Sequence, residues 1–326
     1  MKIAVLGAGA WGTALASLLQ KAGNSVTLWG HNPAWLEEIR RSGRNERFLP
    51  GIELAEQLKF ESDLRQAIAT SQCAVIAVPS KGFRDVAAHL ANYGGMIVSV
   101  TKGIDYETGL TMCGILDEVS PKSQHAALSG PSFAIEVARG IPTAIVAAST
   151  DAETAAKAQA LFNTPEFRVY TSADVKGVEL GGALKNVIAI AAGVGDGMRF
   201  GDNSKAALVT RAIAEIRRLG VTCGAQSETF TGLSGLGDLI VTCFSKHSRN
   251  RAFGERIGRG EKAADIAASM VTVAEGYPTA RAAYRLARKH DVVTPVIDEV
   301  YAMLFEGKDV RRSVTDLMSR DLKAED

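Results

Sequence analysis

Two lysines and one aspartate in largely apolar surroundings are the residues best suited to chemistry. Lys185 lies in residues 180–189, a segment that is otherwise almost entirely apolar or small. Burial of an ammonium group is costly and lowers its pKa from about 10.4 towards the range used in acid–base catalysis. Asp238 follows a glycine turn and could partner a lysine, and Lys102 follows the apolar residues 96–100. The alternatives are that Lys185 reaches solvent from a helix edge and that Lys102 is an ordinary surface lysine.

Three consecutive donor side chains form a candidate anion site. Ser248, Arg249 and Asn250 stand where a helix reaching Ile257 is expected to begin. An arginine fork and helix-terminal amides together suit the oxygens of a phosphate. An ordinary helix cap with a solvated arginine is the alternative.

The segment from Gly7 to Gly12 reads GAGAWG and fits the GxGxxG pattern. It follows a strand expected at 3–6 and opens a helix expected at 12–22, the context that a dinucleotide-binding loop requires. In such a loop Gly7 permits the tight turn, Gly9 lets a pyrophosphate approach the backbone, and Gly12 allows close packing of helix on strand. A purely structural glycine turn is the alternative.

The residues after the second expected strand, 25–29, bear on the choice of coenzyme. NAD-specific sites often have an acidic residue there, whereas this chain has Gly30, His31 and Asn32. No carboxylate would repel a 2′-phosphate, and His31 could contact one. We therefore expect NADPH to be used, alone or alongside NADH, unless His31 is simply an exposed loop residue.

These groups must be positioned by two different kinds of structure. Short β-branched runs alternate with helical stretches up to about Ser172, with strands expected at 3–6, 25–29, 75–78, 96–100 and 144–147. Beyond it only helices are expected, at 175–194, 204–219, 279–289 and 296–305. The fold class predicted is α/β: a Rossmann-type, doubly wound and mostly parallel sheet over residues 1–172, then an all-α domain over residues 173–326. A nicotinamide site, a lysine and an aspartate in this frame suggest carbonyl reduction of a phosphorylated substrate.

The composition excludes several other classes. The 326 residues carry 37 Lys and Arg against 36 Asp and Glu, with 46% hydrophobic residues. Disorder and nucleic-acid binding are therefore not expected. The four cysteines form no CxxC pair or zinc-ligand spacing, so we expect reduced thiols and no metal. Glycines interrupt the apolar residues 3–19, and no other segment is expected to span a membrane, which favours a cytoplasmic protein.

Several long motifs occur in an order that resembles one known family. They are GAGAWGTALA from Gly7, SGPSFAIEVARGIPTA from Ser129, LGGALKNVIAIAAGVGDGM from Leu180, TGLSGLGDLIVTC from Thr231, SRN at Ser248 and EGYPTA from Glu275. The chain resembles the NAD(P)-dependent glycerol-3-phosphate dehydrogenases of bacteria from end to end.

This resemblance implies reversible reduction of dihydroxyacetone phosphate to sn-glycerol 3-phosphate, the precursor of glycerophospholipids. It implies that Lys185 is the catalytic acid and base, with Asp238, Lys102 and Thr242 beside it. The substrate-binding positions it implies are Lys102, Gly130, Ser132, Lys185, Asp238, Ser248, Arg249 and Asn250. The implied NADPH- or NADH-binding positions are Gly7, Gly9, Ala10, Trp11, Gly12, His31, Phe83, Lys102, Ala134, Arg249, Val273 and Glu275.

Two other functions remain open from the sequence. One is a related two-domain dehydrogenase that acts on a different hydroxy substrate, and the other is an NAD(P)H sensor without turnover. The presence of both Lys185 and Asp238 favours an enzyme. We also expect a homodimer, because apolar segments of the helical domain such as 296–305 are expected to be exposed.

Overall fold

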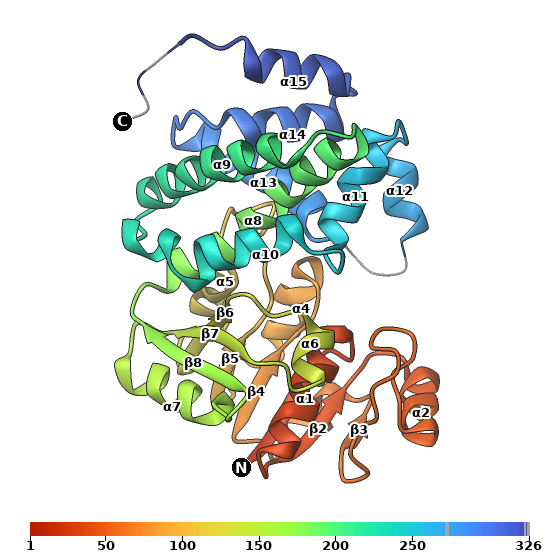
Figure 1. Cartoon of the computed structure of the whole chain (residues 1–326). Helices are drawn as coiled ribbons and strands as arrows, with labels where there is room; N and C mark the ends of the chain where they lie inside the picture. The colour runs from red at the N-terminus through yellow and green to blue at the C-terminus, as the bar shows by residue number, and fades with distance from the viewer. Residues whose placement is uncertain (271–273, 323, 325–326) are drawn as a thin grey trace.

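The molecule has an α/β half and a helical half, which Figure 1 shows at opposite ends of the view. The structure is a computed structural model, and it describes residues 1–270, 274–322 and 324. The N-terminus lies at the α/β end and the C-terminus at the helical end (Figure 1).

The α/β half is built on one eight-stranded sheet with the order β3-β2-β1-β4-β5-β6-β7-β8. All neighbouring strands are parallel except β6 and β7, which are antiparallel. The strands are β1 (Lys2–Leu6), β2 (Ser25–Trp29), β3 (Lys59–Glu61), β4 (Cys73–Ile76), β5 (Met96–Ser99), β6 (His125–Ser129), β7 (Thr143–Ala148) and β8 (Phe167–Ser172). The order reverses between β1 and β4, so the carboxyl ends of these strands form the edge at which ligands bind in open α/β sheets.

Helices cover both faces of the sheet because the strands are apolar on both sides. In β1, Ile3 and Val5 belong to one core cluster, and Ala4 and Leu6 belong to the other. The first face packs against α1 (Ala10–Lys21), α2 (Pro33–Ser42), α6 (Ala134–Ala138) and α7 (Ala152–Phe162). The second face packs against α3 (Leu64–Ile68), α4 (Phe83–Ala88) and α5 (Met112–Val119). The predicted doubly wound, mostly parallel sheet is confirmed.

The strands β3, β6 and β8 were not predicted from the sequence. The strand expected at 75–78 begins earlier, at Cys73. β3 has only three residues at the edge of the sheet, and β6 begins with His125 and is rich in alanine. β8 alternates buried and exposed residues, which is an edge-strand pattern that the sequence analysis did not use.

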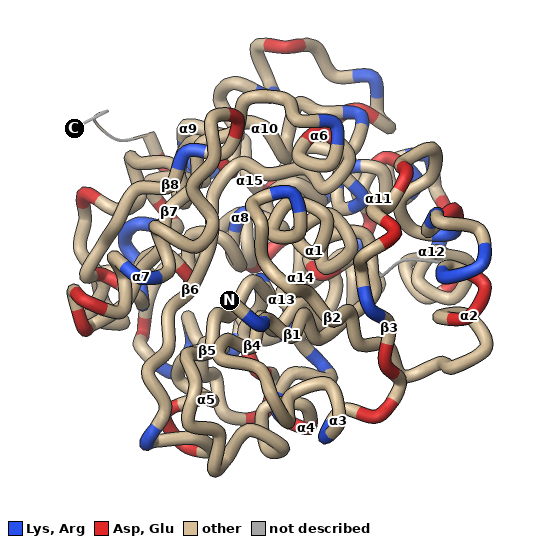
Figure 2. Tube along the Cα trace, turned by 90° about the horizontal axis from the view of Figure 1, so that it is seen from below, with Lys and Arg blue, Asp and Glu red and all other residues tan. Residues whose placement is uncertain are grey.

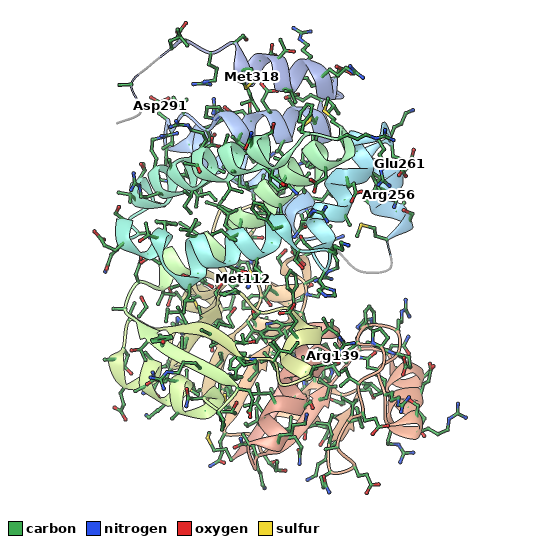
Figure 3. All side chains as sticks on the ribbon, viewed as in Figure 1. Met112, Arg139, Arg256, Glu261, Asp291 and Met318 are labelled. Atoms are coloured by element: carbon green, nitrogen blue, oxygen red, sulfur yellow. The ribbon has the colours of Figure 1, made fainter. Side chains whose placement is uncertain are left out.

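The helical half is arranged around α8 (Val175–Gly197), whose residues from Gly177 to Ile190 are all buried. The other helices are α9 (Asp202–Thr222), α10 (Asp238–Phe244), α11 (Arg249–Gly258), α12 (Ala263–Ser269), α13 (Gly276–Lys289), α14 (Pro295–Phe305) and α15 (Val310–Met318). Figure 3 shows Met318 of α15 at the end of the molecule farthest from the strands. The predicted all-helical second half is confirmed.

Glycines set the close crossing of α8 and α11. A Cβ at Gly193 would lie 1.9 Å from the carbonyl oxygen of Arg251, and one at Gly254 would lie 1.9 Å from that of Ile190. The two backbones therefore touch directly, which places the first half of α11 beside the C-terminal part of α8.

Two expectations about surfaces need correction. The helix α8 is long and apolar enough to cross a membrane by length and composition, contrary to the sequence analysis, but 94% of its most apolar window is buried inside the protein. In α14, residues Val296, Ile297, Val300 and Leu304 are buried, so the expected apolar surface at 296–305 is wrong. That segment therefore gives no support to a dimer.

Charge is spread over the whole chain. Figure 2 shows Lys and Arg interspersed with Asp and Glu around the molecule. Arg256 and Glu261, labelled at one side of the helical half in Figure 3, form one such pair, with Nη2 and Oε2 2.5 Å apart.

Candidate functional site

The turn between β1 and α1 is shaped by backbone. Gly7 has φ +126°, and a Cβ there would lie 2.6 Å from the carbonyl oxygen of Ala77. A Cβ at Gly12 would lie 1.8 Å from the carbonyl oxygen of Gly7, whereas one at Gly9 would meet nothing within 4 Å. Ala10 begins α1, whose N-terminus has no side-chain cap and no acidic residue in its first turn. This end of α1 can therefore offer N–H groups to an anion such as a pyrophosphate.

Two neighbours of this turn also fit a bound dinucleotide. Trp11 is half-buried, and its indole Nε1 is buried without a hydrogen-bond partner. Such an orphaned donor is unusual and could be satisfied by a ligand. Ala134 is half-buried at the first position of α6, a helix that packs beside α1.

The remaining expected coenzyme residues of this half differ in accessibility. His31 is exposed after β2, and Asn32 caps α2 by accepting a hydrogen bond from the Trp35 amide at 3.1 Å. Phe83 is fully buried in the core at the start of α4, so neither its side chain nor its backbone is exposed in this structure. Val273 lies outside the described residues.

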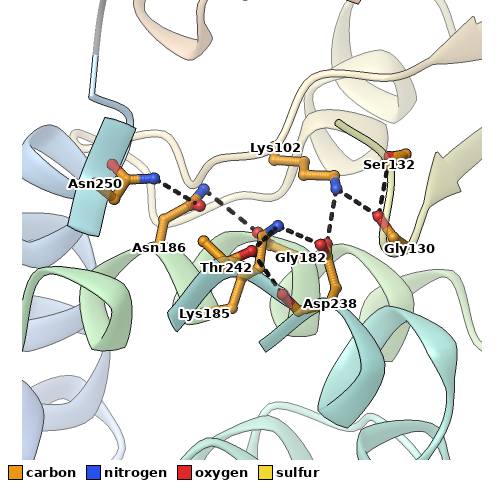
Figure 4. Close-up of polar contacts among 9 residues, drawn as sticks. All are labelled: Lys102, Gly130, Ser132, Gly182, Lys185, Asn186, Asp238, Thr242 and Asn250. Atoms are coloured by element: carbon orange, nitrogen blue, oxygen red, sulfur yellow. Dashed lines mark hydrogen bonds and ion pairs between the residues drawn. The ribbon is translucent and has the colours of Figure 1, made fainter. Parts of the chain in front are cut away.

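One carboxylate joins the two lysines (Figure 4). Lys102 donates to Oδ2 of Asp238 at 2.7 Å, and Lys185 donates to the other oxygen, Oδ1. Lys185 also donates to the hydroxyl oxygen of Thr242 at 2.8 Å, and Thr242 donates to the Asp238 carbonyl at 2.6 Å. Asp238 is 1% exposed, and Lys185 is also buried. The expected catalytic residues are thus brought together.

Small residues of α8 allow this close approach. A Cβ at Gly182 would lie 2.4 Å from Oγ of Ser129, at the end of β6, and 3.6 Å from Cγ of Lys102. A Cβ at Gly181 would lie 2.7 Å from the carbonyl oxygen of Ser234, in the π-helical turn η3 (Leu233–Gly237) that leads into α10. The two glycines therefore let Lys185 reach the carboxyl edge of the sheet.

The electrostatic surroundings of Lys185 suit proton transfer. Burial is the main cause that lowers its pKa, to about 7, and the charge of Lys102 lowers it further. The carboxylate of Asp238 opposes both effects. A group with this pKa exchanges a proton readily near neutral pH.

Gly130 and Ser132 form the sheet side of the same site. The ammonium group of Lys102 donates to the Gly130 carbonyl at 2.9 Å, and Oγ of Ser132 donates to that carbonyl at 3.0 Å. Gly130 has φ +146°, and a Cβ there would lie 3.1 Å from Cα of Ile145, so glycine is required. This turn after β6 fixes Lys102 next to Asp238.

The expected anion-binding triplet opens α11. Oγ of Ser248 caps the helix by accepting from the Arg251 amide at 3.1 Å. Asn250 is buried, donates to Oδ1 of Asn186 at 2.8 Å and accepts from the Gly276 amide at 2.8 Å. The Ser248 cap and the hydrogen bonds of Asn250 together fix the backbone of Arg249, which lies between them.

Arg249 lies between these anchors and has an accessible side chain. None of the hydrogen bonds or ion pairs among the described residues involves it. Neighbouring protein nevertheless desolvates it and lowers its pKa, an effect that the carboxylate of Glu275 opposes. Its guanidinium is therefore available to an external anion.

Glu275 connects this triplet to the α/β half. Oε2 of Glu275 accepts from the hydroxyl of Ser80 at 2.6 Å, in the turn after β4. Burial raises the pKa of Glu275, whereas Ser80 and Arg249 lower it. The expected coenzyme residue Glu275 thus contacts the carboxyl edge of the sheet.

Two participants were missed from the sequence. Asn186 follows Lys185 on α8 and orients Asn250, and Ser80 holds Glu275. Asn186 could have been found as a second polar residue in an apolar helix, and Ser80 as a hydroxyl just beyond the end of a strand.

The described residues contain no group of three or more His, Cys, Asp and Glu that could hold a metal. All four cysteines are free, and Cys223 alone among them is not fully buried.

A Rossmann-type sheet with an open glycine turn, facing a buried lysine bound to a carboxylate in the helical half, is typical of a nicotinamide-dependent dehydrogenase. The comparisons with known proteins narrow this class. Residues 2–155 match the profile of the NAD-dependent glycerol-3-phosphate dehydrogenase N-terminus, and residues 174–315 match that of its C-terminus. The chain belongs to the NAD-dependent glycerol-3-phosphate dehydrogenase family.

Individual relatives agree over their full lengths. The glycerol-3-phosphate dehydrogenase [NAD(P)+] of Geobacter sulfurreducens is 50% identical, with 99% of this chain and 98% of the relative covered. That of Syntrophotalea carbinolica is 49% identical, with 100% and 99% covered. The crystal structure of glycerol-3-phosphate dehydrogenase from Coxiella burnetii superposes with a TM-score of 0.94 at 36% identity, covering 98% of this chain and 99% of that one.

Proposed function

We propose that this chain catalyses the reversible, NAD(P)-dependent reduction of dihydroxyacetone phosphate to sn-glycerol 3-phosphate. The observation that carries the proposal is the single buried carboxylate of Asp238, which holds Lys102 and Lys185 at the carboxyl edge of the sheet. The names of the full-length relatives support the same reaction.

The α/β half would hold the coenzyme, which when bound supplies or accepts the hydride at the ketone carbon. The turn formed by Gly7, Gly9 and Gly12, with the N-terminus of α1, would bind its pyrophosphate. Other residues proposed to contact the coenzyme are Ala10, Trp11, His31, Phe83, Lys102, Ala134, Arg249, Val273 and Glu275.

Lys185 would exchange the proton of the reaction. As an ammonium group it donates a proton to the oxygen of the ketone while that oxygen becomes a hydroxyl, and as an amine it accepts the proton in the reverse direction. Asp238 and Thr242 would hold Lys185 in place, and Lys102 would orient the same oxygen. The pKa of about 7 for Lys185 supports this role in both directions.

The phosphate of the substrate would bind at the start of α11. Arg249 would provide a two-pronged contact, and Ser248, Asn250, Gly130 and Ser132 would complete the substrate site. Binding energy at the phosphate, remote from the reacting carbon, would fix that carbon in the reactive geometry.

The coenzyme is proposed to be NADPH, alone or alongside NADH. The support is that no acidic residue directly follows β2, where exposed His31 stands instead. We expect kcat/KM with NADPH to equal or exceed that with NADH, and His31→Ala to lower only the value for NADPH. Turnover with NADH alone would contradict this choice.

Location and assembly are part of the proposal. We infer a cytoplasmic homodimer that supplies sn-glycerol 3-phosphate for glycerophospholipid synthesis, with residues 1–172 and 173–326 as its two domains. Light scattering of the purified chain gives the mass that tests the dimer.

The reaction is tested by mixing the protein with NADPH and dihydroxyacetone phosphate and following the loss of reduced-nicotinamide absorbance. Parallel samples contain NADH or unphosphorylated dihydroxyacetone. We expect rapid oxidation that depends on the phosphate. Binding of NADPH without oxidation would contradict the proposal and favour a sensor, and oxidation only with another hydroxy or keto compound would favour a related dehydrogenase.

A further inference from the structure

A buried carboxylate on α8 lies outside the cluster around Asp238. Glu179 is 6% exposed and accepts hydrogen bonds from the Cys113 amide, at 3.0 Å to Oε1 and 3.3 Å to Oε2. The hydroxyl of Thr111 also stabilises this carboxylate and lowers its pKa, against the effect of burial. Thr111 and Cys113 form the N-terminus of α5, where a carboxylate is favourably placed. Glu179 therefore ties the central helix of one half to a helix of the other.

The segment held by Glu179 is the one that carries Lys102. Residues 101–111 connect β5 to α5, and a β-bridge joins Ile104 to Thr111. The Asp105 amide donates to the Leu110 carbonyl at 2.8 Å, just inside this bridge. Thr111, at the end of this connection, is thus paired with Ile104, which is only two positions from Lys102.

The middle of the same connection is docked in the helical half. Ile104 is buried in the core of that half. The ring of Tyr106 lies under the guanidinium of Arg285 on α13, 4.0 Å from ring centroid to Cζ. Lys102 itself is held in the α/β half by the Gly130 carbonyl, and Thr101 beside it donates to the Val78 carbonyl at 2.7 Å. The residues that follow Lys102 add a second set of contacts, with helices of the other half.

The face of α8 completes this arrangement. Glu179, Gly182 and Asn186 are three and four residues apart and share one face of the helix. Gly182 lies against the stem of Lys102, and Asn186 holds Asn250. One face of α8 therefore makes two contacts with the segment 102–113. Glu179 holds its end at Cys113, and Gly182, one turn further along α8, lies against Lys102.

We propose that Glu179 is a positioning residue that sets the place of Lys102 relative to Asp238 and Lys185 through the segment 101–113. This inference rests on the proposed function, since it concerns the rate of that reaction. Glu179 does not touch the reacting groups, and its effect passes through Thr111 and Ile104.

The chain offers a matched control for a purely structural role. Glu215 of α9 is also buried, and it accepts from the amides of Val296 at 3.0 Å and Ile297 at 2.9 Å at the start of α14. Burial raises the pKa of both Glu179 and Glu215 to about 7, and each carboxylate accepts from backbone amides at the start of a helix. In Figure 1, α14 lies on the far side of the helical half from the sheet.

The test compares Glu179→Gln with Glu215→Gln in the full chain. We expect both to lower the unfolding temperature, because each weakens a buried helix cap. Glu179→Gln alone should lower kcat, by about 10-fold, because Lys102 would no longer be held in place beside Asp238. Because Lys102 lowers the pKa of Lys185, a displaced Lys102 should also move the pH–rate midpoint upward in Glu179→Gln and not in Glu215→Gln.

Equal kcat values and midpoints in the two variants would overturn the inference. If Glu179→Gln fails to fold, Thr111→Val removes the hydroxyl that stabilises the intact carboxylate and should also lower kcat. An unchanged kcat in that variant would equally overturn the inference. Wild-type turnover in the same assay separates the claims. Absence of turnover in the wild type contradicts the proposed function. Turnover in the wild type, with equal kcat in Glu179→Gln and Glu215→Gln, contradicts only the role of Glu179.

Discussion

The glycine turn before α1 and the cluster around Asp238 lie at the same edge of the sheet but are built in opposite ways. The turn consists of backbone from six consecutive residues, and its essential property is the absence of side chains at Gly7, Gly9 and Gly12. The cluster consists of side chains from three separate parts of the sequence, and its essential property is charge balance among Lys102, Lys185 and Asp238.

This difference separates two kinds of sensitivity. A site made of backbone is damaged by added volume, whereas a site made of buried charge is damaged by a change of a few atoms at constant volume. We therefore expect substitutions at the turn to act on coenzyme binding and substitutions at the cluster to act on turnover.

The largest expected effect is that of Asp238→Asn. It leaves two ammonium groups beside a neutral amide, which should reduce turnover by at least about 100-fold and destabilise the fold by about 3 kcal/mol. Turnover and urea unfolding check both numbers. Asp196→Asn is the matched control, because Asp196 also bridges two cations, Lys205 at 2.6 Å and Arg251 at 2.5 Å. A similar loss of turnover in Asp196→Asn would show that the effect is not specific to the cluster around Asp238.

The next effect is at the proposed phosphate site. Arg249→Ala should raise KM for dihydroxyacetone phosphate by about 100-fold, the cost of losing a charged two-pronged contact, and change turnover of unphosphorylated dihydroxyacetone little. Arg256→Ala, farther along α11 and paired with Glu261, serves as the control and should leave KM unchanged. An unchanged KM in Arg249→Ala would count against the phosphate assignment.

A third effect comes from pH. The pKa of Lys185 is about 7, so its ammonium form is lost as pH rises through 7. The rate of ketone reduction should therefore fall by up to about 10-fold per pH unit above 7, whereas the rate of alcohol oxidation should fall below 7. The pKa is about 10.4 in the unfolded chain, so this group should make the free energy of unfolding rise with pH between about 7 and about 10.4. Parallel pH profiles for the two directions would refute this role of Lys185.

The smallest effect concerns the turn. Gly9→Ala places its Cβ in open space, so the unfolding temperature should stay unchanged while the Kd for NADPH rises about fivefold, or about 1 kcal/mol. Gly12→Ala brings a Cβ against the Gly7 carbonyl and should instead destabilise the fold by about 1–3 kcal/mol. Calorimetry and a fluorescence titration distinguish the two. Weakened binding in neither variant would remove the turn from the coenzyme site.

The two regions also differ in how far the sequence predicts them. The turn is a local pattern, because strand, glycines and helix are adjacent in the chain, and its geometry matches the expectation. Lys102, Lys185 and Asp238 could each be singled out as polar residues in apolar surroundings. The family resemblance placed Asp238 and Lys102 beside Lys185, but residue patterns alone could not. Lys102 and Lys185 are 83 positions apart, and the packing of α8 on the sheet edge brings them to the two oxygens of Asp238.

Long-range packing also explains the errors. The antiparallel pairing of β6 and β7 and the burial of α14 depend on which elements lie next to each other. An amphipathic or apolar segment shows that its apolar face must be buried. It does not show whether that face packs against another part of the same chain or against a second chain. The pairs Ser80–Glu275 and Asn186–Asn250 escaped notice for the same reason, because each joins distant segments.

The most direct test of the account is a paired measurement on wild type and Lys185→Met: the Kd for NADPH from fluorescence, and the rate of NADPH oxidation with dihydroxyacetone phosphate. The account predicts a Kd within about twofold and a rate at least about 100-fold lower in the variant, because Lys185 is proposed to carry the proton and not to contact the coenzyme. Substantial turnover in Lys185→Met would contradict the claim that the buried lysine carries the proton.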